Sequence, residues 1–317
     1  MRQSLPAQLA SRQGSRPWGR PLALTLAVGL ALLTWLRLHD GQSTAMAAAP
    51  PIASQAAIVP HPISRSAIAA GVESRARGIL DDAGGTTAMV AAMPGQAPFV
   101  ALNANAALPS ASLYKLGVMA AVYNAFAKGN LTPSQQTTVT QEDVDTYGDA
   151  PATAPGTVVT VQEALQRMIT VSDNSAAGAL IDLVGESAVD AAFAANGMPG
   201  THLGSPSSGV AETTAADQAA FFQRLLDGQV VSRTASQQMI QLLEGQQEND
   251  RLPAKLPPGT IVAHKTGELD GVRNDSGIIF TPAGPVICVV LVSDQPEGGR
   301  AVDAIADLGL LVFQAVS

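Results

Sequence analysis

Residues 168–177 read Met-Ile-Thr-Val-Ser-Asp-Asn-Ser-Ala-Ala. The polar triplet Ser172-Asp173-Asn174 interrupts two runs with helical spacing of apolar residues, a place where such triplets often cap the next helix. Two further motifs accompany it in the chain, Ser112-Leu113-Tyr114-Lys115 before it and Lys265-Thr266-Gly267 after it. The chain has only four lysines, and two of them lie in these motifs. Their order and local setting therefore guide the interpretation of the whole sequence.

The first motif combines a potential nucleophile with a potential base. Pro109 and Ser110 predict a helix start, which places Ser112 in the first turn and Lys115 three residues later on the same face. A serine hydroxyl becomes a good nucleophile when a neighbour takes its proton, and a lysine can do so if its pKa is lowered. Apolar surroundings that would lower it are predicted from Leu113, Leu116, Met119 and Val122. The structural alternative is a capped core helix whose lysine reaches solvent.

The other two motifs supply groups that suit proton transfer and anion binding. Ser172 can relay a proton to a leaving nitrogen, and the carboxamide of Asn174 can bind a substrate amide. Lys265 and Thr266 end a strand-like run and can hold a carboxylate, while Gly267 allows close approach to the backbone. Taken singly, the first of these motifs is better explained as a helix cap and the second as a polar strand end.

Together, the three motifs resemble the active-site signature of class A β-lactamases and penicillin-binding proteins. The likeness extends through residues 168–177 and covers about residues 64–316, with Asn274-Asp275 fitting the family's next strand. It implies an acyl-serine mechanism without a cofactor, with Ser112 as nucleophile and Lys115 as its base. It also implies an oxyanion held by the backbone N–H groups of Ser112 and Glu268. The expected substrate is a small molecule, a β-lactam or a muropeptide-like amide.

The sequence departs from this family at one catalytic element. Class A β-lactamases carry a Glu-x-x-Leu-Asn loop whose glutamate activates the deacylating water, and residues 198–214 contain no such string. Glu212 is the only acid in that stretch and precedes a predicted helix, so it is better explained as a helix-entry residue. The alternatives are a D-alanyl-D-alanine carboxypeptidase or esterase, or a penicillin-binding protein that deacylates slowly. A degenerate binding module is a further alternative, against which the intact Ser112, Lys115 and Ser172 argue.

The order of predicted elements indicates an α/β (α+β) fold of the β-lactamase type. Strands are predicted near both ends of the chain and helices between them, which implies an antiparallel sheet from N- and C-terminal segments, flanked by helices, with an all-helical subdomain inserted. The predicted strands are residues 86–92, 98–102, 260–265, 277–280 and 286–292. The predicted helices are residues 66–82, 112–128, 161–169, 174–183, 186–196, 215–226, 233–243 and 300–316.

The N-terminal region has the features of an export signal. Four arginines precede an apolar run over residues 21–36, and Ala45-Met46-Ala47 fits a cleavage site. Residues 1–47 are therefore predicted to be a signal peptide, with an uncleaved membrane anchor as the alternative, and residues 48–63 a linker. The domain of residues 64–317 would then be secreted, periplasmic or associated with the cell envelope, contacting a membrane only through that anchor.

Composition limits the partners and the chemistry. The 317 residues, 46% of them hydrophobic, carry a net charge of −8, and five of the 18 basic residues but one of the 26 acidic residues precede residue 48. The acidic domain excludes nucleic acid as a partner. The single Cys288 lies in an apolar run and allows no intramolecular disulfide, and the histidines lack metal-ligand spacing. We therefore expect no metal and no cofactor, and a monomer.

Overall fold

The computed structural model describes residues 65–147, 153–204, 210–296 and 299–317. The predicted leader (1–47) and linker (48–63) lie outside the described residues and stay predictions. In the described part, none of the helices is long and apolar enough to cross a membrane.

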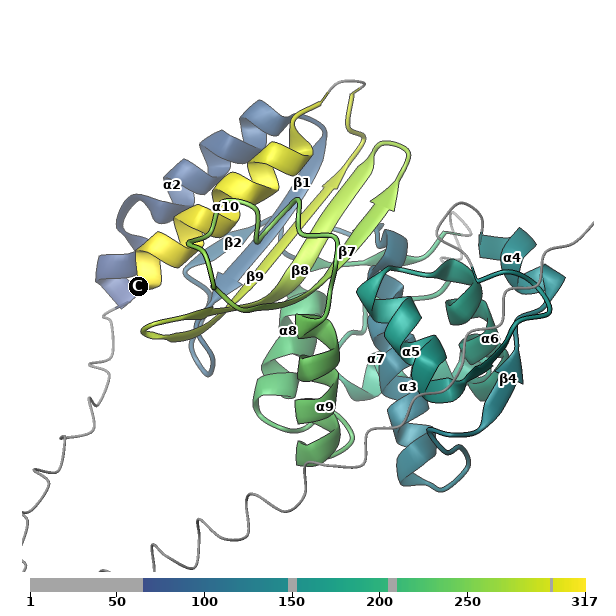
Figure 1. Cartoon of the computed structure of the whole chain (residues 1–317). Helices are drawn as coiled ribbons and strands as arrows, with labels where there is room; N and C mark the ends of the chain where they lie inside the picture. The colour runs from purple at the N-terminus through teal and green to yellow at the C-terminus, as the bar shows by residue number, and fades with distance from the viewer. Residues whose placement is uncertain (1–64, 148–152, 205–209, 297–298) are drawn as a thin grey trace, which may run out of the picture. The chain divides into compact units, whose positions relative to one another are not determined.

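A five-stranded antiparallel sheet joins the two ends of the domain in the order β2-β1-β9-β8-β7 (Figure 1). Its strands are β1 (Thr86–Ala92), β2 (Val100–Leu102), β7 (Val262–Leu269), β8 (Val272–Thr281) and β9 (Gly284–Ser293). β1 pairs with β9, from Thr86 opposite Ser293 to Ala92 opposite Ile287, so segments distant in the sequence lie side by side. The predicted sheet, built from distant parts of the chain, is confirmed.

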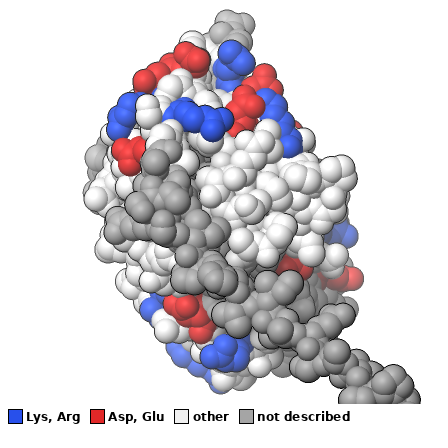
Figure 2. All heavy atoms as spheres, turned by 90° about the vertical axis from the view of Figure 1, so that its left-hand side faces the viewer, with Lys and Arg blue, Asp and Glu red and all other residues white. Residues whose placement is uncertain are grey.

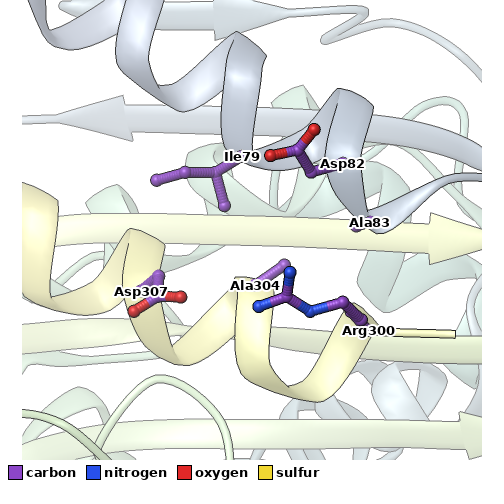
Figure 3. A pocket seen from close by; sticks show the side chains of 6 residues that line it. All are labelled: Ile79, Asp82, Ala83, Arg300, Ala304 and Asp307. Atoms are coloured by element: carbon purple, nitrogen blue, oxygen red, sulfur yellow. The ribbon is translucent and has the colours of Figure 1, made fainter.

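Helices α2 (Arg65–Ala83) and α10 (Ala301–Val316) lie together on one face of the sheet (Figure 1). A small cavity of about 60 Å³ lies where they meet, and Figure 3 shows Asp82 of α2 facing Arg300 and Asp307. The surface on this side carries basic and acidic side chains next to one another, with neither sign forming a continuous patch (Figure 2). This side is therefore a structural layer without a dominant charge.

The opposite face of the sheet is covered by α8 and by the helices of the inserted part (Figure 1). Those elements are α3 (Lys115–Ala127), α4 (Gln141–Tyr147), α5 (Val161–Thr170), α6 (Asn174–Val184), α7 (Glu186–Ala195), α8 (Ala215–Leu226) and α9 (Arg233–Glu244). Two small strand pairs accompany them, β3 (Leu108–Pro109) with β6 (Glu212–Thr213) and β4 (Gln136–Thr138) with β5 (Val158–Thr160). The inserted subdomain is thus mainly, not entirely, helical.

The central strands divide the core into two clusters because successive strand residues point to opposite faces. On β9, Val289 and Leu291 pack against the inserted helices, while Cys288 and Val290 pack against α2 and α10. All four side chains are fully buried, so a continuous apolar run is needed in a strand that is covered on both faces. The prediction that Cys288 is a buried strand residue is confirmed.

The sequence pattern failed mainly at short or polar elements. The prediction for β8 began at residue 277, whereas the strand begins at Val272, because polar residues 274–276 are buried and bonded rather than exposed. Helix α4 and the two small strand pairs were not predicted, since two to seven residues give little periodicity. The predicted long helix from residue 112 is also wrong at its start, because a 3₁₀ turn precedes α3 there.

Candidate active site

Ser112 lies in the 3₁₀ turn η1 (Ala111–Tyr114), directly before α3. Ala111 has a φ of +45°, a left-handed conformation that is unfavourable for a residue with a Cβ atom. The turn is held from β8, where Asn274 Nδ2 donates to the carbonyl oxygens of Pro109 at 2.9 Å and Ser110 at 3.2 Å. Such strain persists where the surroundings fix the backbone, and here it directly precedes the proposed nucleophile.

Lys115 is the first residue of α3, and its side chain is completely buried. Its Nζ donates to the Ser172 carbonyl oxygen at 2.5 Å, to Asn174 Oδ1 at 2.5 Å and to Ser172 Oγ at 3.2 Å. Lys265 of β7 is equally buried, and its Nζ donates to the same Ser172 Oγ at 2.9 Å. The three sequence motifs therefore meet, with one serine hydroxyl between two lysine amines.

This arrangement changes the basicity of both lysines. Burial, and then the charge of Lys265, hold the pKa of Lys115 well below the ordinary lysine value, despite the opposing effects of Asp173 and Glu248. Burial also lowers the pKa of Lys265 to about 8, although Glu248 and Asp275 oppose this shift. The lowered pKa of Lys115 favours proton acceptance, whereas Lys265, with a pKa of about 8, is still mainly protonated at neutral pH.

The turn that carries Ser172 is defined by the helices on either side. Helix α5 starts with a capping box between Thr160 and Glu163, and α6 starts with Asp173 as its N-cap, accepting from Ala176 N. The buried Asp173 carboxylate also accepts from the backbone N–H and the hydroxyl of Thr153, at 3.0 and 2.6 Å. Ser172, with a φ of +59°, is thereby held in a left-handed conformation with its carbonyl and hydroxyl both facing Lys115.

Gly267 has a structural role besides the ligand approach expected from the sequence. A Cβ atom built at this position would lie 2.8 Å from the Ser110 carbonyl oxygen and 3.2 Å from Ala111 Cβ. The missing side chain therefore lets β7 pack directly against η1, which carries Ser112. Glycine here sets the distance between Ser112 and Glu268, the next residue of the strand.

We expect Gly267→Ala to lower kcat/KM about 10²-fold, because small displacements of reacting groups are costly. We also expect it to lower the free energy of unfolding by about 1–3 kcal/mol through overpacking. Gly78→Ala in α2 is the matched control, since a Cβ there meets nothing within 4 Å. Kinetics and denaturant unfolding of both variants measure these effects, and unchanged activity in Gly267→Ala would contradict the positioning role.

Thr266 and Glu268 lie in a network of opposite charges. The hydroxyl of Thr266 donates to the Glu248 carboxylate, and Glu268 pairs with Arg251 and with Arg273, the latter at 3.1 Å. Arg251 is fully buried and also lies 3.6 Å from Asp250, which it meets as an ion pair. The predicted carboxylate-binding residues are therefore accompanied by two arginines that sequence reasoning missed.

Two buried residues, His264 of β7 and Asp275 of β8, position the loop that carries Glu248 and Arg251. His264 Nδ1 lies 2.9 Å from Asp275 Oδ1, and His264 Nε2 lies 3.1 Å from Asn249 Oδ1. Asp275 Oδ2 also accepts from the backbone N–H of Leu252 at 3.0 Å. These contacts attach residues 249–252 to β7 and β8, next to Lys265.

A cavity of about 510 Å³ opens beside Ser112. Its lining includes Ser112, Tyr114, Asn174, Leu203 and two carboxylate residues, Glu186 and Glu268. This volume lies in the range of small-molecule sites. Of the predicted residues, Ser112, Asn174 and Glu268 line it directly, whereas Lys115, Ser172 and Lys265 form the hydrogen-bonded group next to it.

Glu212 does not lie among the residues that line this cavity. It belongs to β6, where it is paired with Pro109 of β3 and forms a bridge with His202. Thr214, two residues later, caps α8 by accepting from Asp217 N. Glu212 is therefore a strand residue and not the helix-entry residue that was predicted, although a helix does begin close behind it. Among the described residues, no group of three His, Cys, Asp or Glu side chains could hold a metal ion.

Four side chains at the site were missed from the sequence. Glu248 and Arg251 belong to an irregular loop after α9, and Glu186 begins α7. A loop has no periodicity, so only its tertiary contacts reveal which side chains face the motifs. Arg273 lies opposite Glu268 in the β7–β8 register. A prediction with the correct start of β8 would therefore have placed these two side chains together.

Sequence relatives of the chain are β-lactamases. The extended-spectrum β-lactamase PER-1 of Pseudomonas aeruginosa is 29% identical over 231 residues, which cover 62% of this chain and 71% of that protein. A β-lactamase of Streptomyces cellulosae is 28% identical over 210 residues, covering 62% and 68%.

Solved structures agree with this relationship. The β-lactamase of Sphaerobacter thermophilus superimposes with a TM-score of 0.69 at 30% identity, covering 80% of this chain and 98% of that one. The structure of PBP-A has a TM-score of 0.69 at 22% identity, covering 77% and 95%, and supports the fold alone. The model of the β-lactamase enzyme family matches residues 71–316. The chain therefore belongs to the β-lactamase enzyme family.

Proposed function

We propose that this protein is a serine β-lactamase that opens the amide of a β-lactam through an acyl-serine intermediate. One arrangement carries the proposal: Ser172 Oγ lies 3.2 Å from Lys115 Nζ and 2.9 Å from Lys265 Nζ, beside the cavity that Ser112 lines. The β-lactamases among the sequence relatives support the choice of substrate.

In the proposed acylation, Ser112 Oγ attacks the carbonyl carbon of the lactam while neutral Lys115 accepts the hydroxyl proton. The backbone N–H groups of Ser112 and Glu268 stabilise the negative charge on the carbonyl oxygen. The C–N bond then breaks, and Ser172 passes a proton from the lysine pair to the nitrogen. The product is an ester between the substrate and Ser112.

Deacylation completes the cycle when water attacks this ester and Ser112 regains its proton. The chain lacks the Glu-x-x-Leu-Asn string that serves this step in class A enzymes. A D-alanyl-D-alanine carboxypeptidase or a slowly deacylating penicillin-binding protein would share the acylation step, but the sequence relatives favour the β-lactamase.

Turnover assays on the full chain separate these activities. We expect the loss of lactam absorbance with a penicillin at a steady rate over many turnovers, and no release of D-alanine from a peptide ending in D-alanyl-D-alanine. D-alanine release without lactam hydrolysis would replace the proposed function by the carboxypeptidase.

Substrate binding is expected to weaken as the pH rises through about 8. Below this pH Lys265 carries the ammonium that attracts a substrate carboxylate, and above it the amine becomes neutral. We therefore expect KM for a penicillin to rise above pH 8. Because a single proton is lost, the rise is at most about tenfold per pH unit. Steady-state kinetics from pH 6 to 10 measure this dependence, and a constant KM up to pH 10 would contradict it.

A further inference from the structure

The group expected to receive a substrate carboxylate is already in contact with a carboxylate of the protein. Glu248 accepts the hydrogen bond from the Thr266 hydroxyl. Its carboxylate also lies 3.9 Å from Arg251 Nη1. Glu248 thus occupies the Thr266 hydroxyl and lies in ion-pair range of Arg251, next to Lys265, where a substrate anion would bind.

Arg251 has capacity for a further anion. Its side chain is only 1% exposed, and its Nε and Nη1 atoms make no hydrogen bond within the described part of the chain. Nη1 lies within ion-pair range of Glu248 and Asp250 without bonding to either, and Nη2 contacts Glu268. Buried guanidinium donors without partners are costly, so an anion placed here would gain bonds as well as charge attraction.

The charges in this region nearly cancel. Lys265, Arg251 and Arg273 face the carboxylates of Glu248, Asp250 and Glu268. A substrate carboxylate that binds here therefore meets no excess of positive charge, and it lies next to the negative charge of Glu248. The side chain of Glu248 is 39% exposed, which leaves it free to turn toward solvent when another anion takes its place.

We propose that Glu248 is a specificity-determining residue that competes with the substrate carboxylate for Thr266 and Arg251. This inference rests on the proposed function for the identity of the substrate. Glu248 weakens the binding of substrates that carry an anion at this position. Neutral analogues such as esters or amides therefore bind almost as well as the acids. The same acyl-transfer groups then serve a broader set of acyl donors.

The test compares a penicillin with its methyl ester in the wild-type full chain and in Glu248→Gln. The glutamine keeps an acceptor for Thr266 but removes the charge. We expect KM for the acid to fall about tenfold and KM for the ester to change less than twofold. A tenfold change corresponds to the loss of one partly screened contact between like charges. Measurement at pH 6 keeps Lys265 protonated, since Glu248 helps to maintain its charge.

Asp250→Asn is the matched control. It removes a carboxylate that pairs with the same arginine but is not bonded to Thr266, and it is expected to change the acid-to-ester ratio less than twofold. An equal change for acid and ester in Glu248→Gln, or a higher KM for the acid, would overturn the inference.

Boronic acids separate this inference from the proposed function. If neither protein hydrolyses penicillin, the proposed function fails, and calorimetry then compares phenylboronic acid with 3-carboxyphenylboronic acid, which bind a reactive serine reversibly. We expect Glu248→Gln to tighten binding of the carboxylate compound alone by about tenfold, from removal of the like charge. Equal effects on both compounds, or no effect on either, would overturn the role of Glu248.

Discussion

Replacing Ser112 by alanine is expected to lower kcat/KM for a penicillin by about 10⁴-fold or more, the scale seen when a catalytic nucleophile is removed. Ser112 lies in the strained turn η1, lines the cavity of about 510 Å³, and precedes by three residues the lysine whose pKa is lowered by burial. Without its hydroxyl no acyl-enzyme forms. Residual hydrolysis would come only from binding and the backbone N–H groups.

The stability of the variant distinguishes loss of the nucleophile from loss of the fold. Ser112 is half-buried, and removal of its hydroxyl is expected to change the free energy of unfolding by less than about 1 kcal/mol. Ser110→Ala is a useful comparison, since the hydroxyl of Ser110, directly before the same turn, donates to the Ala111 carbonyl oxygen. Retention of full activity in Ser112→Ala would exclude the proposed mechanism.

Lys115→Met is expected to lower kcat about 10³-fold with a small change in KM, the usual range for removal of a general base. The amine is buried, its pKa is well below the ordinary value, and it bonds both Ser172 and Asn174. Methionine nearly preserves the length and volume of the side chain but cannot accept the serine proton. The effect therefore belongs to the chemical step rather than to binding.

The control for this prediction is Lys128→Met, the same substitution at the exposed C-cap of the same helix. It is expected to change kcat less than twofold. Circular dichroism and thermal unfolding of both variants show whether α3 is preserved. An active Lys115→Met variant would transfer the role of base to another group, with Lys265 as the remaining buried amine beside Ser172.

The parts of the site that were predictable from sequence are those with motifs on regular elements. Lys115 begins a helix directly after the 3₁₀ turn of Ser112, Ser172 and Asn174 lie at a helix–helix turn, and Lys265 lies on a strand. The structure brings these residues to one site. Their roles remain predictions, since only the fold and family have been established by comparison.

The contacts of Glu248 and Arg251 were not predictable, because they depend on long-range polar bonds rather than on periodicity. The loop after α9 is held by Asp275 and His264, two residues that a pattern of apolar alternation does not mark as buried. The start of β8 was missed for the same reason. Its residues Asn274 and Asp275 are polar, yet both are completely buried and bonded to other segments.

Intact-protein mass spectrometry of the full chain over time with a penicillin tests the acyl-serine mechanism most directly, with Ser112→Ala beside it. We expect a transient adduct with the mass of the intact penicillin on the wild type alone, while hydrolysed penicillin accumulates. A lasting adduct on the wild type alone would keep the acyl-serine step and replace the β-lactamase by a slowly deacylating penicillin-binding protein. Hydrolysis without any adduct on the wild type, or an equal adduct on Ser112→Ala, would contradict Ser112 as the nucleophile.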